Sequence, residues 1–308
     1  MTETHIWYTI GNIPKQPANE HFLKDLIIIS SIPIAIVAFI GNGIVCCLFW
    51  SKWKSSRFFL YFLNIAIANI AILINVFVSF PKLYLQVRIY NLFQHLVQMV
   101  QYLGHNTRFY ILTAICAERY LVIFFPALVK HYRSQYTSVI VTGILWGLSC
   151  LISVVDDLAC SRRFYITNME YTVHCVPFTI LIIILELVIF LFIMGFSTVS
   201  IFIRMQTQPT PPARLDITIL TTVLLFLVTD TPTRMIQTLS VWFALNNVSI
   251  TIATTELLDC INCAVTPFIF LIVGCWKKTS EPIWLFLERA LTAEESMAEG
   301  PQVEQEQV

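Results

Sequence analysis

Seven stretches of mostly apolar residues follow one another along the chain, and each is long enough to cross a lipid bilayer as an α-helix. Crossing takes about 20 helical residues, because each backbone amide in lipid must find its hydrogen-bond partner within the segment. The stretches cover residues 25–50, 57–80, 91–124, 136–158, 176–203, 215–243 and 250–274. The pattern predicts an all-α membrane protein, a seven-transmembrane-helix bundle over residues 25–274.

Positive charge after the first span predicts the orientation of this bundle. Lys52, Lys54 and Arg57 follow the span closely, whereas acidic and basic residues are mixed before it. Because Lys and Arg concentrate on the cytoplasmic side, we expect an extracellular N-terminus over residues 1–24. Residues 275–308, which include an acidic tail, are then cytoplasmic, and the chain is expected to be a multi-pass protein of the plasma membrane.

Polar residues in the third span fall at steps of three or four, so they share one face of a helix. A polar face at membrane depth must look into the bundle or into water, and the third helix is therefore expected to be central. The register holds Gln94, Gln98, Gln101, His105, Arg108, Leu112, Ile115 and Arg119.

The cytoplasmic end of the third span reads Glu118-Arg119-Tyr120. A carboxylate beside a guanidinium allows a local ion pair that can break and release the arginine. The tripeptide is thus a candidate switch. In the alternative interpretation, the two charges only mark the membrane boundary.

Composition agrees with a chain that is surrounded largely by lipid. Hydrophobic residues make up 57% of the chain and charged residues 12%, whereas a soluble domain has about half and about a quarter. Lys plus Arg and Asp plus Glu both number 19, so no basic excess indicates nucleic acid as a partner. The partner that composition does predict is the lipid bilayer.

The pattern disfavours an enzyme and a transporter. Catalysis would need a nucleophile with a base, or a cluster of metal ligands, but His95 and His105 lie ten residues apart in one span, beside no acid or cysteine in the sequence. We therefore expect no catalytic residue, no metal and no cofactor. Transporters usually have paired inverted halves with broken helices, and without such a duplication this class is a remote alternative.

Ordered motifs make the chain resemble the rhodopsin-like class A receptors over nearly its whole length. They are Gly41-Asn42, Asn64 to Asn69, Glu118-Arg119-Tyr120, Trp146, Pro232 and Pro267. Within this class the chain is most similar to the Mas-related receptors, because Leu121 to Pro126 reads LVIFFP and Phe268 to Gly274 reads FIFLIVG. Residues from Ser280 to Leu291 are similar to the short amphipathic eighth helix of Mas-related members.

The resemblance implies a G-protein-coupled receptor in which a ligand shifts the bundle toward an active arrangement. A heterotrimeric G protein would bind a cytoplasmic cleft formed by Arg119, Tyr120 and the loops over residues 126–133 and 204–214. A chemosensory receptor of the taste or pheromone type is the alternative, since such chains have similar lengths and lack some of the same motifs.

The resemblance also implies a disulfide between Cys160 and Cys175. Most rhodopsin-like receptors tie the third span to the second external loop, but here the third span has only Cys116, at its cytoplasmic end. Cys160 and Cys175 bracket the loop between the fourth and fifth spans, as in Mas-related members that join these two helices directly. Two unpaired thiols are the alternative, because sequence does not establish the geometry that a disulfide needs.

Two acids near the end of the fourth span are candidates for binding a cationic ligand. Asp156 matches the position at which ligand-binding Mas-related members have an acid, and Asp157 follows it. The ligand implied is a small peptide or a cationic small molecule such as an amphiphile. The chain departs from those members at Thr179, where they often have a second acid, and both aspartates would also be stable as solvated residues at a helix end.

Arg108 needs an anionic partner, because a buried guanidinium is unfavourable unless it is paired. It faces Asn69, which stands where related receptors have the aspartate that helps to hold sodium. Asp230 is the favoured partner, since the pair would join the third and sixth spans beside a proline hinge. In the alternative, Arg234 pairs with Asp230 and Arg108 pairs with Asp259. Asn69, Arg108 and Asp230 are therefore candidate switch residues.

Further polar and ionisable residues of the spans are expected to line a net acidic ligand pocket. They are Gln101, Glu186, Arg234, Glu256 and Asp259. Outside the spans, Asn247-Val248-Ser249 is a glycosylation sequon in the third external loop.

Overall fold

The computed structural model describes residues 18–52, 57–84, 91–132, 136–160, 168–208, 213–242 and 248–275. Nearly all of these residues are helical, as expected for apolar segments that satisfy their backbone hydrogen bonds internally. The helical segments are α1 (Ala18–Lys52), α2 (Arg57–Tyr84), α3 (Asn91–Phe124), α4 (Pro126–Tyr132), α5 (Thr137–Cys160), α6 (Asn168–Ile183), η2 (Ile184–Leu191), α7 (Phe192–Thr207), α8 (Arg214–Trp242) and α9 (Val248–Cys275).

The seven predicted spans are all present as helices, which confirms the predicted helical bundle. The fifth span begins at Asn168, earlier than predicted, and runs without a break to Thr207 through α6, the π-helix η2 and α7. The segment after Pro126, predicted as a loop, contains the short helix α4. The expected eighth helix and the sequon residue Asn247 lie outside the described residues.

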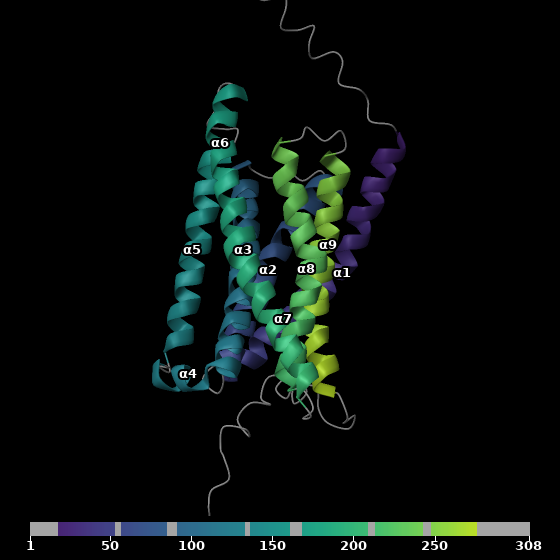
Figure 1. Cartoon of the computed structure of the whole chain (residues 1–308). Helices are drawn as coiled ribbons and strands as arrows, with labels where there is room; N and C mark the ends of the chain where they lie inside the picture. The colour runs from purple at the N-terminus through teal and green to yellow at the C-terminus, as the bar shows by residue number, and fades with distance from the viewer. Residues whose placement is uncertain are drawn as a thin grey trace, which may run out of the picture.

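Helix α3 is the centre of the bundle, as its polar register predicted. It contacts α2, α5, η2, α7 and α8. Figure 1 shows α5 and α6 on one flank and α1 on the other, and α1 packs against α2 and α9. The polar face of α3 is buried from His105 to Arg119, whereas Gln98, closer to the start of the helix, is exposed.

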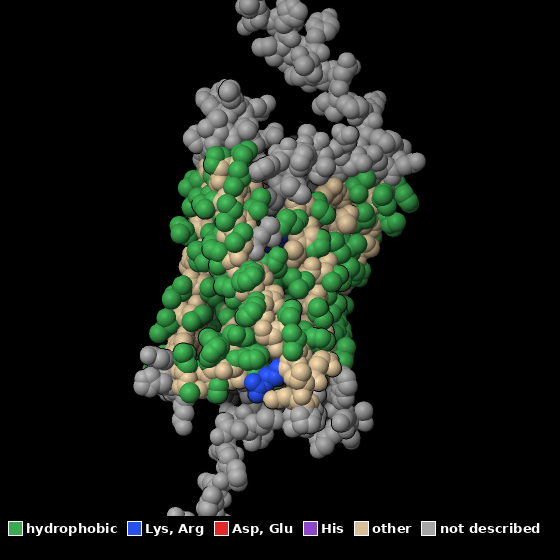
Figure 2. All heavy atoms as spheres, in the orientation of Figure 1, with side chains coloured by type: hydrophobic (Ala, Val, Ile, Leu, Met, Phe, Trp, Pro, Cys, Tyr) green, Lys and Arg blue, Asp and Glu red, His purple; other side chains and the backbone are tan. Residues whose placement is uncertain are grey.

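The flanks of the bundle are suited to lipid. Six helical segments among the described residues are long and apolar enough to cross a membrane, and they lie in α1, α2, α5, α6 to α7, α8 and α9. Helix α3 is not among them, because its polar face lowers its hydropathy. Large apolar side chains such as Phe192 and Val228 point outward, and hydrophobic side chains cover the face seen in Figure 2. Soluble proteins rarely expose so much apolar surface.

Aromatic rings pack the interior around α3. Phe109 stacks on Phe226 of α8 with ring centroids 5.3 Å apart, and Tyr110 stacks on Phe190 of η2 at 4.4 Å. Such pairs add about 0.5–1.5 kcal/mol each beyond the burial of their surface. They attach α8 and η2 to the same turn of α3.

Gly104 allows α3 to approach α2 closely. A Cβ atom at this position would lie 2.7 Å from the carbonyl oxygen of Ala68 and 2.9 Å from Cγ1 of Ile72. Small residues commonly permit such close approach between membrane helices. The contact brings the adjacent polar turn of α3, which contains His105 and Arg108, against α2.

Gly104→Ala should weaken this helix contact. The added methyl group must push α2 away from α3, so we expect a loss of about 1–3 kcal/mol in the free energy of unfolding. The measurement is the thermal unfolding midpoint of the purified chain in detergent. Gly143→Ala is the matched control, because nothing lies within 4 Å of a Cβ at that position. Equal midpoints for the two variants would show that the close approach is not required.

Candidate functional site

Arg108 lies at the centre of the bundle, where its side chain is almost fully buried. Its Nη2 atom contacts Oδ1 of Asp230 on α8 and lies 3.9 Å from Oδ1 of Asp259 on α9. Asp230 also accepts a hydrogen bond of 3.2 Å from Asn262 Nδ2, and its Oδ2 lies 3.7 Å from Nε of Arg234. Of the two pairings left open by the sequence, the structure has Arg108 with Asp230.

A line of hydrogen bonds runs from Arg108 through α2 and α1 to α9. Arg108 Nη1 donates to Oδ1 of Asn69 at 3.3 Å, and Asn69 Nδ2 donates to Oδ1 of Asn42 at 2.9 Å. Asn42 Nδ2 in turn donates to the carbonyl oxygen of Cys263 at 2.8 Å. An amide at position 69 can accept from the arginine and donate onward, whereas an ionised carboxylate could only accept.

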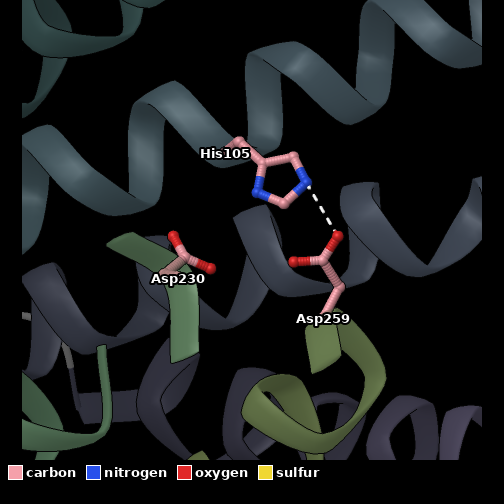
Figure 3. Close-up of side chains that lie close together, drawn as sticks. All are labelled: His105, Asp230 and Asp259. Carbon is pink, nitrogen blue, oxygen red and sulfur yellow. Dashed lines mark ion pairs between the residues drawn. The ribbon is translucent and has the colours of Figure 1, made fainter. Parts of the chain in front are cut away.

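His105 faces Asp259 one turn from Arg108, with its Nε2 atom 3.2 Å from Oδ2 of the carboxylate. Figure 3 shows this pair from α3 and α9, with Asp230 of α8 beside it. One ligand atom from each of His105, Asp230 and Asp259 lies within 4.8 Å of the other two, a spacing that suits a metal ion. Arg108 shares this space, however, and its positive charge opposes a metal cation.

His95 and His105 have no acid beside them in the sequence, but each faces an acid of another helix in the structure. His95 Nε2 lies 2.7 Å from Oδ1 of Asp157 on α5, and His105 faces Asp259 on α9. Each acid comes from another helix, so distance along the sequence gave no sign of it.

Glu186 and Arg234 form a second buried ion pair, between η2 and α8. Arg234 Nη1 donates to Oε1 of Glu186 at 2.7 Å, and the guanidinium lies over the ring of Phe109, 5.3 Å from its centroid. Nη1 and Nη2 of Arg234 also each donate to Oδ1 of Asn106 at 3.4 Å. Asn106 donates to Ser153 of α5 at 3.3 Å, so this pair belongs to a contact among four elements.

We call the end of the bundle that holds Cys160 and Cys175 the disulfide end. The predicted bond is present and joins the last residue of α5 to α6, with the two Cα atoms 4.7 Å apart, so the alternative of two unpaired thiols is wrong. Thr179, the departure noted in the sequence, donates to the carbonyl oxygen of Cys175 at 2.8 Å. The hydroxyl group of Thr179 thus has a hydrogen-bond partner within its own helix.

Asp156 and Asp157 lie one turn from the disulfide and differ in their surroundings. Asp157 pairs with His95. Among the described residues, Asp156 has no hydrogen-bond or ion-pair partner, although it is close enough to Asp157 and Glu186 to be repelled by both. Asp156 is therefore a half-buried anion in acidic surroundings.

Several of the residues that were expected to line one acidic pocket have partners within the bundle. Glu186 is neutralised by Arg234, and Asp259 turns inward to His105. Glu256 accepts a hydrogen bond of 3.2 Å from Asn75 of α2, and Gln101 is half-buried on α3.

At the other end of α3, Arg119 is buried and contacts Oδ1 of Asp216 on α8 through its Nε atom. The sequence had offered the adjacent Glu118 as its partner, and the contact with α8 was missed. A signal was present, since Asp216 begins the sixth span at the depth where the third span ends. Tyr120 packs against Phe196 of α7, with ring centroids 5.5 Å apart.

Comparisons with known proteins agree with this arrangement. The family model of the seven-transmembrane receptors (rhodopsin family) matches residues 41–270. The human proto-oncogene Mas is 28% identical over 298 residues, which cover 93% of this chain and 87% of that protein. The chain is also similar to the rat Mas-related G-protein coupled receptor member D, at 27% identity over 282 residues and 86% of both chains. Mouse Mas-related member B2 is 28% identical over 283 residues, which cover 87% of this chain and 81% of that protein.

Arg108→Met should destabilise the bundle strongly, because it leaves the carboxylate of Asp230 buried without its main partner. Breaking a buried ion pair costs about 3–5 kcal/mol. The double variant Arg108→Met/Asp230→Leu removes both charges and should recover much of this loss. Thermal unfolding of the two single variants and the double variant gives the coupling energy. Additive effects would mean that the two side chains do not stabilise each other.

Proposed function

The chain belongs to the rhodopsin family of seven-transmembrane receptors, as a Mas-related G-protein-coupled receptor, and we propose that it binds a small basic peptide or a cationic amphiphile at Asp156. Membership makes it a multi-pass protein of the plasma membrane. We place the disulfide end outside the cell, as the distribution of Lys and Arg around the first span favours. The Arg119 end then faces a heterotrimeric G protein.

The observation that carries this proposal is the state of Asp156. An ionisable group within a membrane span is unfavourable unless it is paired or hydrated, which makes it a candidate for function. Neighbouring acids have partners in the bundle, since Asp157 pairs with His95 and Glu186 pairs with Arg234. Asp156 lacks such a partner among the described residues. A ligand cation would supply it and relieve the repulsion from Asp157 and Glu186.

Transmission to the G protein follows from α8, which connects both ends of the bundle. Its Arg234 contacts Glu186 near the proposed ligand site, and its Asp216 holds Arg119 at the opposite end. A ligand that draws Glu186 away from Arg234 would favour an arrangement with α8 displaced. Displacement would separate Asp216 from Arg119 and open the cleft at Arg119 and Tyr120.

Asp156→Asn should abolish most of the response to cationic ligands, whereas Asp157→Asn should have a smaller effect because His95 already engages Asp157. A hydrogen bond to a charged group contributes about 1.5–3 kcal/mol, so we expect potency to fall at least about tenfold. The measurement is G-protein activation in cultured cells challenged with short basic peptides and amphiphilic amines.

Surface expression of each variant is the control for this experiment. Arg119→Ala should bind ligand at the cell surface and fail to activate the G protein. Equal responses from wild type and Asp156→Asn would place the ligand site elsewhere. A response to neutral odorant-like compounds and to no cation would favour the chemosensory alternative.

Asp216→Asn should raise signalling in the absence of ligand. The substitution removes the anion that holds Arg119 against α8 in the closed arrangement, so a larger fraction of receptors adopts the open arrangement. We expect basal G-protein activation to rise severalfold at matched surface expression. Asp216→Glu keeps the charge and is the matched control. Unchanged basal activity in Asp216→Asn would show that this ion pair does not maintain the closed state.

A further inference from the structure

Arg204 lies in the last turn of α7, and its side chain bonds to the end of α3. We propose that Arg204 binds the phosphate of an anionic phospholipid, whose acyl chain lies along the lipid-facing surface of α7. The proposal adds a partner to those of ligand capture and G-protein coupling, and it holds whether or not a cation binds at Asp156.

The first argument is that the positive charge of Arg204 is not neutralised within the bundle. Three other arginines each contact a carboxylate, namely Arg108, Arg119 and Arg234. Arg204 contacts only neutral groups among the residues that the structure describes. Near a membrane surface, anionic lipids are the source of the missing negative charge.

The neutral contacts hold the guanidinium of Arg204 in place. Its Nη1 atom donates to the carbonyl oxygen of Ile123 at 2.9 Å, and its Cζ atom lies 5.6 Å from the centroid of the Phe124 ring. The amide oxygen of Gln208, in the orientation that satisfies both polar atoms of the amide, accepts from Nη2 at 3.2 Å and from Nε at 3.3 Å. Part of the donor fork remains unused, and phosphate oxygens accept strong hydrogen bonds from such a fork.

The second argument is a stripe of exposed apolar side chains along α7, which ends beside Arg204. Its members share one face of the helix, since they are spaced by three or four residues, and each is more than half exposed: Phe192, Phe196, Val199 and Ile203. The stripe is about 16 Å long, roughly half of the ~30 Å hydrocarbon layer. An acyl chain of a single leaflet therefore matches it in length.

Arg204 lies at the boundary of this apolar surface. Its contact with Ile123 directs it toward α3, whereas the preceding Ile203 is exposed. Figure 2 shows basic side-chain atoms at the lower edge of the hydrophobic band. Phospholipid phosphates lie at the boundary between apolar and polar surroundings, so a lipid along the stripe brings its phosphate to the level of this guanidinium.

Aromatic rings of α3 extend the lipid-facing surface next to Arg204. Tyr120 packs against Phe196 of the stripe, with ring centroids 5.5 Å apart, and against Phe124 at 4.8 Å. Phe124 is exposed and lies under the guanidinium of Arg204. A lipid bound here contacts α3 and α7 together, beside a residue of the proposed G-protein cleft.

A lipid fits this surface better than an acidic segment of a soluble protein does. Such a segment reaches Arg204 only from the aqueous side, and it leaves the stripe from Phe192 to Ile203 without a partner. A phospholipid supplies the anion and the apolar chain in one molecule.

Photocrosslinking of the purified full chain in phosphatidylcholine nanodiscs tests the site without ligand or G protein. The probe is a phosphatidylserine that carries a photoreactive group in its acyl chain, and mass spectrometry of the digested chain locates the label. We expect labelling between Phe192 and Ile203, and several times less from a phosphatidylcholine probe with the same chain. Water-soluble glycerophosphoserine in excess should not compete, because it lacks the acyl chain.

Arg204→Gln should reduce the labelling by phosphatidylserine about fivefold, the factor expected for one basic residue near a membrane surface. Arg214→Gln removes one positive charge at the start of α8, and as the matched control it should be labelled like the wild type. If Arg204→Gln does not fold, Thr207→Glu tests the same site. It places a carboxylate on the helix surface next to Arg204 and should reduce the labelling to a similar extent.

Four results would overturn the proposal. Equal labelling by the two probes would show that the apolar surface alone attracts lipid, and competition by glycerophosphoserine would show a site for the free anion. Equal losses in Arg204→Gln and Arg214→Gln would mean that net charge concentrates the lipid. Unchanged labelling in Arg204→Gln would reject the site, and a simultaneous loss of G-protein binding would assign Arg204 to that partner. Failure of the cationic-ligand proposal leaves the labelling unchanged, because no ligand is present.

Discussion

A guanidinium buried among transmembrane helices must be neutralised and hydrogen-bonded inside the bundle, because no bulk water solvates it there and lipid offers no hydrogen-bond partner. Arg108 imposes this condition from the central helix α3. Asp230 of α8 supplies the charge, Asn69 of α2 accepts a hydrogen bond, and Asn42 carries the connection to α1 and to the backbone of α9. One positive charge thereby holds five helices in register, in a region where apolar packing alone would permit them to slide.

Helix α8 carries charged side chains at three depths, and they pair with two different elements. Asp216 and Asp230 contact α3, and Arg234 contacts η2. Charged contacts between helices can exchange partners without dismantling the apolar core, so α8 is the element best placed to have two stable positions. In the proposed function, a displacement of α8 at one of these three side chains would move the other two, and this would couple the two ends of the bundle.

Periodicity along single helices was sufficient to predict the bundle and the central place of α3. Both predictions follow from the rule that polar side chains at membrane depth must face the interior of the bundle and not the lipid. The sequence left two possible partners for Arg108, because Asp230 and Asp259 lie at similar depths in the membrane. Contacts such as His95 with Asp157 and Arg119 with Asp216 were missed. They depend on how far each helix is rotated and shifted against its neighbour, and spacing within one helix carries no information on that. The contacts of Glu186 with Arg234 and of Asp259 with His105 were missed for the same reason, since each partner lies on another helix.

The π-helix η2 constrains the length of the chain in a way that no other described helix does. Its wider turns accommodate an extra residue, so the side chains of α7 are turned by about 100° relative to those of a regular continuation of α6. Cys175, before η2, faces Cys160, and Thr198, after it, donates to Cys116 of α3. Deleting one residue between Ile184 and Leu191 would restore a regular helix and make these two contacts mutually exclusive. The number of residues in η2 is therefore constrained in addition to the side chains of Glu186 and Phe190, which make contacts of their own.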